Sequence, residues 1–318
     1  MPARFTALAA PEAVVAALAG QGYIADRGLG TAVFLAARLG KPLLVEGPAG
    51  VGKTELARAL AGWSDLPLLR LQCYEGLDEG KSLYEWQYGK QLLYTQILKD
   101  HVNAALGGAA GGLDGAMTRL HAVGERFYAA EFLAPRPLLQ ALQAPAGAVL
   151  LIDEIDKADP EFEAFLLEML ADFQVSIPEL GRIAARVRPF VVLTSNAARD
   201  LGDALKRRCL HLHIGFPDAA LEGRIVAARA PEAGPALRAA LVAFVQGLRN
   251  LDLRKLPSVS ETIDWARALV LLHTTVLGPE TVRETLNVLL KYEVDVETAA
   301  RALGGLMEEA RRAAAIAG

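Results

Sequence analysis

The 318-residue sequence has only two cysteines, few aromatic residues and no long apolar run. Cys73 and Cys209 lie far apart, which excludes the spacing of a cysteine metal or redox motif and predicts two buried thiols in a reducing compartment. No stretch of 18 or more uncharged apolar residues occurs, so we expect no membrane-spanning helix. The start of the chain lacks the apolar core of a signal peptide. These absences predict a cytoplasmic protein.

An excess of basic charge is also lacking. The chain has 33 Lys and Arg against 37 Asp and Glu, a formal net charge of −4. General electrostatic attraction to DNA or RNA is therefore not expected. Apolar residues make up 53% and charged residues 22%. These fractions and this length are typical of a globular protein with one large and one small domain.

Short apolar runs alternate with helical patterns in the first two thirds of the chain. The runs are PLLVE from Pro42, LLRLQC from Leu68, AVLLID from Ala148, RPFVVLTSN from Arg188 and CLHLHIGF from Cys209. Helical patterns cover residues 11–19, 27–39, 54–62 and 160–173. Strands that are apolar on both faces and alternate with helices predict a five-stranded parallel sheet flanked by helices.

The composition changes after Phe216. From Ala219 the chain is rich in Ala, Leu and Arg, and Gly or Pro at positions 231, 234–235, 257 and 278–279 breaks it into roughly four helices. We expect an α/β domain over residues 1–216 and a smaller all-helical domain over residues 217–318. The segment LGGAAGGLDGAM from Leu106 predicts a flexible surface loop.

A glycine-rich segment follows the first predicted strand and fits the pattern G-x-x-x-x-G-K-[ST]. It consists of Gly47, Pro48, Ala49, Gly50, Val51, Gly52, Lys53 and Thr54. Such a loop directs backbone N–H groups at a bound anion, and the following helix adds its positive end. Lys53 would reach the terminal phosphates and the Thr54 hydroxyl would bind Mg²⁺. The alternative, a glycine-rich turn with a surface lysine, is the weaker interpretation because strand, helix and all fixed residues are present.

Two carboxylates end the apolar segment VLLIDEID, which begins at Val149. A carboxylate at the end of a buried strand is costly unless it has a cation or another partner. We expect Asp153 to hold Mg²⁺ through water and Glu154 to orient or deprotonate the water that attacks the γ-phosphate. Asp156 is expected to be a solvated residue at the start of a helix.

Further candidate residues follow a predicted strand, end a short helix and alternate along another strand. Asn196, after VVLTS, either hydrogen-bonds the attacking water or γ-phosphate, or caps the following turn. Arg207 and Arg208, at the end of a short helix, either complement the helix dipole or enter a neighbouring subunit's nucleotide site. His211 and His213 alternate along the next strand and predict an exposed strand face rather than a zinc site.

Together, the glycine-rich loop, LLIDEID, LTSN, RRC and the helical C-terminal part resemble an AAA+ ATPase over about residues 21–272. The segment LLRLQCYEGLDEGKSLYEWQYGKQLLYTQ resembles the MoxR branch, and within it the accessory ATPases of carbon monoxide dehydrogenase maturation. The resemblance implies a homo-oligomeric ring, usually a hexamer, with ATP and Mg²⁺ at subunit boundaries. It also implies a von Willebrand factor A domain partner and a client metalloenzyme.

The resemblance assigns roles residue by residue. The glycine-rich loop takes the Walker A role, Asp153 and Glu154 take the Walker B role, and Asn196 takes the sensor-1 role. Arg208 is the first candidate for the arginine finger, and Arg207 is the second.

The resemblance also places the branch's insertions within residues 77–135. The aromatic residues there either contact a client or pack the insertion itself, namely Tyr84, Trp86 and Tyr88. The C-terminal part departs from the family, because Ser260 stands where a sensor-2 arginine is expected. Arg267, two turns later, is either its substitute or a surface residue.

Three functions follow from these observations. The leading one is a ring-forming, Mg²⁺-dependent ATPase that remodels a client during metalloenzyme maturation. The second is a scaffold that binds nucleotide with little turnover. The third is a DNA-acting motor that contacts phosphates through a lysine such as Lys81 or Lys90, against which the acidic net charge argues. The loop motif itself is compatible with both ATP and GTP.

Overall fold

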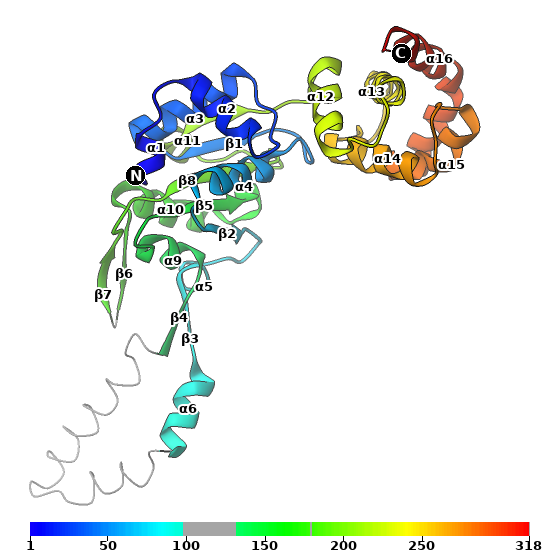
Figure 1. Cartoon of the computed structure of the whole chain (residues 1–318). Helices are drawn as coiled ribbons and strands as arrows, with labels where there is room; N and C mark the ends of the chain where they lie inside the picture. The colour runs from blue at the N-terminus through cyan, green and yellow to red at the C-terminus, as the bar shows by residue number, and fades with distance from the viewer. Residues whose placement is uncertain (98–131, 179, 318) are drawn as a thin grey trace, which may run out of the picture.

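The computed structural model describes residues 1–97, 132–178 and 180–317, and its centre is a five-stranded sheet (Figure 1). The strands are β1 (Leu43–Glu46), β2 (Leu68–Gln72), β5 (Val149–Asp153), β8 (Phe190–Ser195) and β9 (Leu210–His213). All run parallel, in the order β2-β5-β8-β1-β9. These are the five predicted strands, so the predicted fold class is confirmed.

Helices cover both faces of the sheet because its central strands are apolar on both sides. In β5, Val149 and Leu151 belong to one apolar cluster, whereas Leu150 and Ile152 belong to the other. This alternation follows from the two-residue period of a strand. One cluster includes α1 (Ala3–Thr6), α2 (Pro11–Ala19), α3 (Arg27–Leu39) and α4 (Lys53–Ser64). The other includes α5 (Glu79–Leu83), α9 (Pro137–Gln143), α10 (Pro160–Asp172) and α11 (Asp203–Arg208).

Two antiparallel strand pairs were not predicted. They are formed by β3 (Tyr84–Trp86) with β4 (Leu133–Pro135), and by β6 (Gln174–Ile177) with β7 (Gly181–Ala184). Both extend away from the C-terminal helices, and α6 (Tyr88–Ile97) continues from β3 (Figure 1). The loop predicted from Leu106 lies outside the described residues.

Five helices, rather than the expected four, form the chain between residues 219 and 317. They are α12 (Ala219–Arg229), α13 (Pro235–Arg249), α14 (Val259–Leu271), α15 (Pro279–Leu289) and α16 (Glu293–Ala317). The unpredicted break between α15 and α16 contains neither Gly nor Pro. These helices enclose an apolar cluster of their own around Phe244 and Trp265. The boundary after Phe216 stays a prediction.

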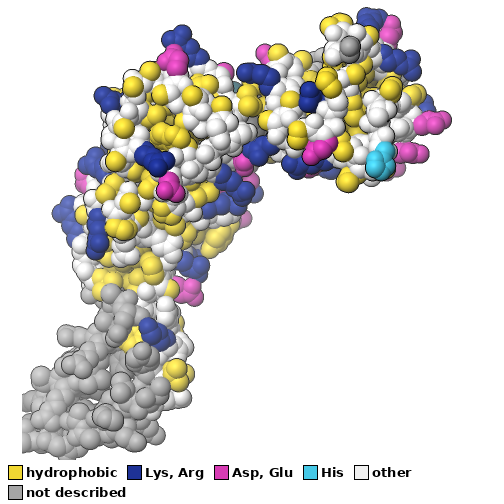
Figure 2. Space-filling model, viewed as in Figure 1, with side chains coloured by type: hydrophobic (Ala, Val, Ile, Leu, Met, Phe, Trp, Pro, Cys, Tyr) yellow, Lys and Arg dark blue, Asp and Glu magenta, His cyan; other side chains and the backbone are white. Residues whose placement is uncertain are grey.

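The surface carries charges of both signs. On the face in Figure 2, Lys and Arg side chains occur over both the α/β part and the C-terminal helices, among Asp and Glu. No helix in the described part of the chain combines the length and apolar character that a membrane span requires.

Both cysteines are buried, as predicted, with Cys73 1% and Cys209 7% exposed. The pKa of each thiol is raised to about 12, mainly by burial, and at Cys73 the charge of Asp153 contributes to this rise. Because the thiolate is the reactive form, we expect iodoacetamide at pH 8 to alkylate the folded protein about a hundredfold more slowly than the unfolded protein. Mass spectrometry of timed samples measures both rates, and equal rates would contradict the burial.

Candidate functional site

The glycine-rich loop joins β1 to α4 at the edge of the sheet where the parallel strands end. Gly47 and Gly50 have φ angles of +149° and +74°. A Cβ atom on Gly47 would lie 2.0 Å from the Ile214 carbonyl oxygen, and one on Gly50 would lie 2.3 Å from Ser258 Oγ. Glycine is therefore required at both positions, for conformation and for space.

Lys53 begins α4 and is buried, with 7% of its surface exposed. Its Nζ donates to the Gly47 and Pro48 carbonyls at 2.7 Å each and to Asn196 Oδ1 at 2.8 Å. All three ammonium protons therefore have acceptors. Burial lowers the pKa of Lys53, while the carboxylates of Asp156, Asp153 and Glu154 act in the opposite direction.

The Asn196 amide bridges two of the predicted site residues. Its Oδ1 accepts from Lys53, and its Nδ2 donates to Glu154 Oε1 at 3.2 Å. The structure thus brings together residues from α4, from the end of β5 and from the end of β8. The side chain of Asn196 contacts these groups directly.

Asp153 lies at the end of β5 and is 3% exposed. Thr54 Oγ1 donates to its Oδ1 at 3.1 Å, and Thr194 Oγ1 donates to the same oxygen. Arg70 contacts the other oxygen, Oδ2, through Nη2 at 2.6 Å. A hydroxyl beside a carboxylate is a donor set that suits Mg²⁺, so Thr54 and Asp153 fit the predicted ion.

Glu154 has a left-handed backbone, with φ +57° and ψ +51°, at the start of the short 3-10 helix η2 (Ile155–Lys157). This conformation is uncommon for a residue other than glycine, and such residues concentrate at functional sites. The backbone N–H of Glu154 donates to Thr194 Oγ1 at 2.9 Å. Gln72 Nε2 and Lys157 Nζ each lie 2.7 Å from Glu154 Oε2, and the hydrogen bond raises the pKa of Lys157.

Arg70, Gln72 and Thr194 were not predicted as site residues. All three are polar residues in the last part of otherwise apolar strands, β2 and β8. That pattern was a signal available in the sequence. Whether these polar residues reach Asp153 and Glu154 depends on the strand order, which places β2 and β8 on either side of β5.

The prediction that Asp156 is a solvated residue was wrong. Asp156 is 4% exposed, and its Oδ2 accepts from the backbone N–H groups of Asn196 at 3.2 Å and Ala198 at 3.0 Å. The turn of η2 after β5 directs this side chain back into the protein. Asp156 thereby fixes the segment that carries Asn196.

We expect Asp156→Ala to lower the free energy of unfolding by about 2 kcal/mol, because two backbone N–H groups lose a buried, charged acceptor. Urea denaturation followed by circular dichroism measures this change. Asp172→Ala, at an exposed position in α10, is the matched control and should change stability little. Equal stabilities of the two variants would contradict a fixing role for Asp156.

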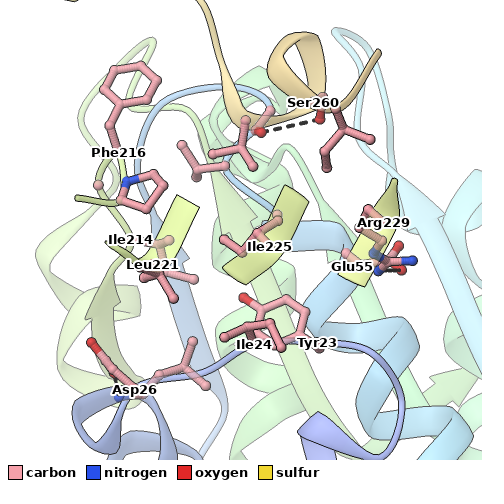
Figure 3. Close-up of a pocket in the computed structure, with 18 of the residues that line it drawn as sticks. Tyr23, Ile24, Asp26, Glu55, Ile214, Phe216, Leu221, Ile225, Arg229 and Ser260 are labelled. Carbon is pink, nitrogen blue, oxygen red and sulfur yellow. Dashed lines mark hydrogen bonds and ion pairs between the residues drawn. The ribbon is translucent and has the colours of Figure 1, made fainter. Parts of the chain in front are cut away.

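A cavity of about 650 Å³ lies beside the loop (Figure 3). Its lining residues come from the N-terminal segment, α4, the end of β9, α12 and α14, and include Tyr23, Ile24, Ile214, Phe216, Ile225 and Ile263. A mostly apolar cavity of this size with a few polar groups suits a small organic ligand.

Two contacts join the C-terminal helices to the loop and its helix. Ser260 donates to the Gly50 carbonyl from both its backbone N–H and its Oγ, each at 3.2 Å (Figure 3). Arg229 pairs with Glu55 at 2.6 Å. Arg267, the proposed sensor-2 substitute, lines the cavity and donates to the Arg229 carbonyl at 3.1 Å.

Arg207 and Arg208 lie elsewhere, at the end of α11, and both are exposed. Neither lines the cavity beside the loop. Both border a shallow hollow of about 520 Å³ between α10 and α11, together with Leu167 and Glu168. The structure therefore does not bring these arginines to the loop of their own chain.

Of the remaining candidates, some pack against the apolar core and others are exposed to solvent. Tyr84 and Trp86 pack against the apolar core, with ring centroids 5.9 Å apart, whereas Tyr88 is 68% exposed. His211 and His213 are both exposed on β9, as predicted.

A glycine-rich loop and carboxylates at one edge of a five-stranded parallel sheet define a P-loop nucleotide-binding protein. The family described as "ATPase family associated with various cellular activities (AAA)" matches residues 43–218, more than half of the chain, and the chain belongs to this family.

Two relatives illustrate its similarity to known proteins. The chain is 26% identical over 231 residues to the denitrification regulatory protein NirQ of Stutzerimonas stutzeri. The aligned region covers 70% of this chain and 69% of NirQ. It is 25% identical over 239 residues to an uncharacterized protein of Staphylococcus aureus (strain USA300), covering 73% and 76% of the two chains.

Proposed function

We propose that the chain is a Mg²⁺-dependent ATPase. The observation that carries this proposal is the bridge from Lys53 through the Asn196 amide to Glu154. It links a cation suited to phosphate with a carboxylate suited to activating water. The three residues come from separate segments of the chain, so it is the fold that brings their side chains into contact.

Each residue of the site has a proposed role. Lys53 and the N–H groups of the loop would bind the phosphates, and Thr54 with Asp153 would hold the ion. Bound Mg²⁺ would neutralise negative charge on the β- and γ-phosphates. Glu154 would orient or deprotonate the attacking water, and Asn196 would keep that water and Glu154 in position. Membership of an ATPase family favours ATP over GTP.

We propose further that residues 1–216 form the nucleotide-binding domain and residues 217–318 a lid. The contacts of Ser260 with Gly50 and of Arg229 with Glu55 support this division. A shift of the loop on nucleotide binding would reach the helical part through them.

The biological role is proposed as that of a MoxR-type remodelling ATPase. The segment that begins LLRLQCYEGLDEG carries the resemblance to that branch, and the similarity to a denitrification regulatory protein agrees with action on another protein. We propose a metalloenzyme as the client, of which carbon monoxide dehydrogenase is one candidate, and a von Willebrand factor A domain protein as the partner.

A ring, proposed as a hexamer, would place Arg208 in the nucleotide site of the neighbouring subunit. The support is its exposure at the end of α11, away from the loop of its own chain. Arg207, one residue earlier, is the second candidate for the same role.

A scaffold with little turnover is the second candidate function. The observation that favours it is the engagement of the Glu154 carboxylate by Gln72, Lys157 and Asn196. Held in this way, Glu154 has less freedom to act on water. A scaffold would keep these contacts when nucleotide binds, whereas a working ATPase would release at least one.

We expect Glu154→Gln to bind ATP within about threefold of the wild-type affinity while kcat falls about 10²–10⁴-fold, because the amide cannot accept the proton of water. Equilibrium binding of a fluorescent ATP analogue and phosphate release measure the two effects. Glu161→Gln, at an exposed position in α10, is the matched control. Unchanged turnover in Glu154→Gln would remove the proposed role and favour the scaffold. The ATP-bound variant also serves as bait for the proposed partner and client.

We expect Arg208→Ala to bind nucleotide normally and to lose about 10³-fold in turnover, since an arginine finger acts on the transition state. Lys53→Ala should fail to bind nucleotide. Mixing the two variants should restore part of the activity, because a Lys53→Ala subunit still offers Arg208 to its neighbour. Steady-state phosphate release measures all three samples. Absence of rescue in mixed assemblies would argue against a shared site, and Arg207→Ala tests the second candidate.

A further inference from the structure

Arg70 of β2 forms an ion pair with Asp153 of the neighbouring strand. Its Nη2 and Nε lie 2.6 and 2.9 Å from Asp153 Oδ2. The arginine side chain is 46% exposed, whereas that of Asp153 is 4% exposed. A cation that remains partly in solvent therefore neutralises a carboxylate that is almost fully buried.

The remaining oxygen of Asp153 is also occupied. Hydroxyl groups of Thr54 and Thr194 donate to Oδ1, so each carboxylate oxygen has polar partners. A buried carboxylate without such partners would be strongly unfavourable. These residues of the chain thus stabilise the buried carboxylate of Asp153.

Arg70 also contacts the side chain that holds Glu154. Its Nη2 donates to Gln72 Oε1, and Gln72 Nε2 donates to Glu154 Oε2 at 2.7 Å. β2 therefore reaches both acidic residues of the site, Asp153 directly and Glu154 through Gln72. An Arg70 side chain that moved away from Asp153 could keep its hydrogen bond to Gln72 Oε1.

We propose that Arg70 is the resident counter-ion of Asp153 and competes for it with the divalent cation that arrives with the nucleotide. This inference rests on the proposed function, because it assigns Asp153 to Mg²⁺. A guanidinium and a divalent cation beside one carboxylate repel each other. The exposure of Arg70 and its flexible stem allow it to move aside. Arg70 is then a positioning residue that lowers the dependence of nucleotide binding on Mg²⁺.

The proposal predicts how Mg²⁺ and nucleotide affinity are coupled. The measured quantity is the ratio of the dissociation constants without and with saturating Mg²⁺, for a fluorescent N-methylanthraniloyl derivative of the β,γ-imido analogue of ATP. In Arg70→Gln, bare Asp153 repels the phosphates when Mg²⁺ is absent, and no cation competes when Mg²⁺ is present. We expect this ratio to rise about threefold or more above the wild-type value.

Two further variants make the test specific. Arg70→Lys keeps the charge but loses the fork of donors, so its ratio should lie between those of wild type and Arg70→Gln. Arg186→Gln removes an exposed arginine near the start of β8, at the opposite edge of the sheet, and should leave the ratio unchanged. Circular dichroism checks that each variant is folded.

The outcomes separate this inference from the proposed function. A wild-type protein that does not bind the analogue with Mg²⁺ would overturn both. Binding by the wild type with an unchanged ratio in Arg70→Gln would overturn only the role of Arg70, because it would show that Arg70 and Mg²⁺ are not coupled. A lower ratio would mean that Arg70 supports the ion instead of competing with it, which also contradicts the proposal. If Arg70→Gln does not fold, an Arg70→Lys ratio at or below the wild-type value has the same consequence.

Discussion

A buried ammonium group governs the arrangement of the polar residues at the edge of the sheet. Lys53 is almost fully enclosed, and an unpaired charge in such a position would cost several kcal/mol, so three acceptors surround its Nζ. Two of these acceptors are carbonyls of the glycine-rich loop, and the third is Asn196. The loop conformation and the orientation of Asn196 are therefore consequences of satisfying one charge.

The parallel sheet makes this arrangement possible. β1, β5 and β8 are adjacent and end at the same edge, so the residues after each strand converge on one place. Glu154 holds an unfavourable backbone conformation there because Thr194 and the η2 turn fix it on two sides. Apolar packing on both faces of β5 supplies the stability that this strain requires.

The parts predicted from the sequence are those with local signals. Apolar runs revealed the five strands, and the glycine pattern revealed the phosphate loop. The failures at the site depend on contacts between distant segments, whereas the missed break between α15 and α16 is local but contains no Gly or Pro to signal it. The burial of Asp156 has no local signal, because its backbone partners lie after β8. The contact of Arg70 with Asp153 can be foreseen only once β2 is known to pair with β5. The antiparallel pairing of β3 with β4 likewise joins Trp86 to Leu133, far along the chain.

The contact between the helical part and the loop is weak in energetic terms. Ser260 offers the Gly50 carbonyl a backbone N–H and a hydroxyl, both uncharged donors. The pair between Arg229 and Glu55 is about one third exposed on each side, and such pairs contribute about 0–1 kcal/mol. A ligand bound in the cavity at micromolar affinity contributes about 8 kcal/mol. Because the cavity is lined by both parts of the chain, a ligand that bound one arrangement of them more tightly would shift their relative positions toward that arrangement.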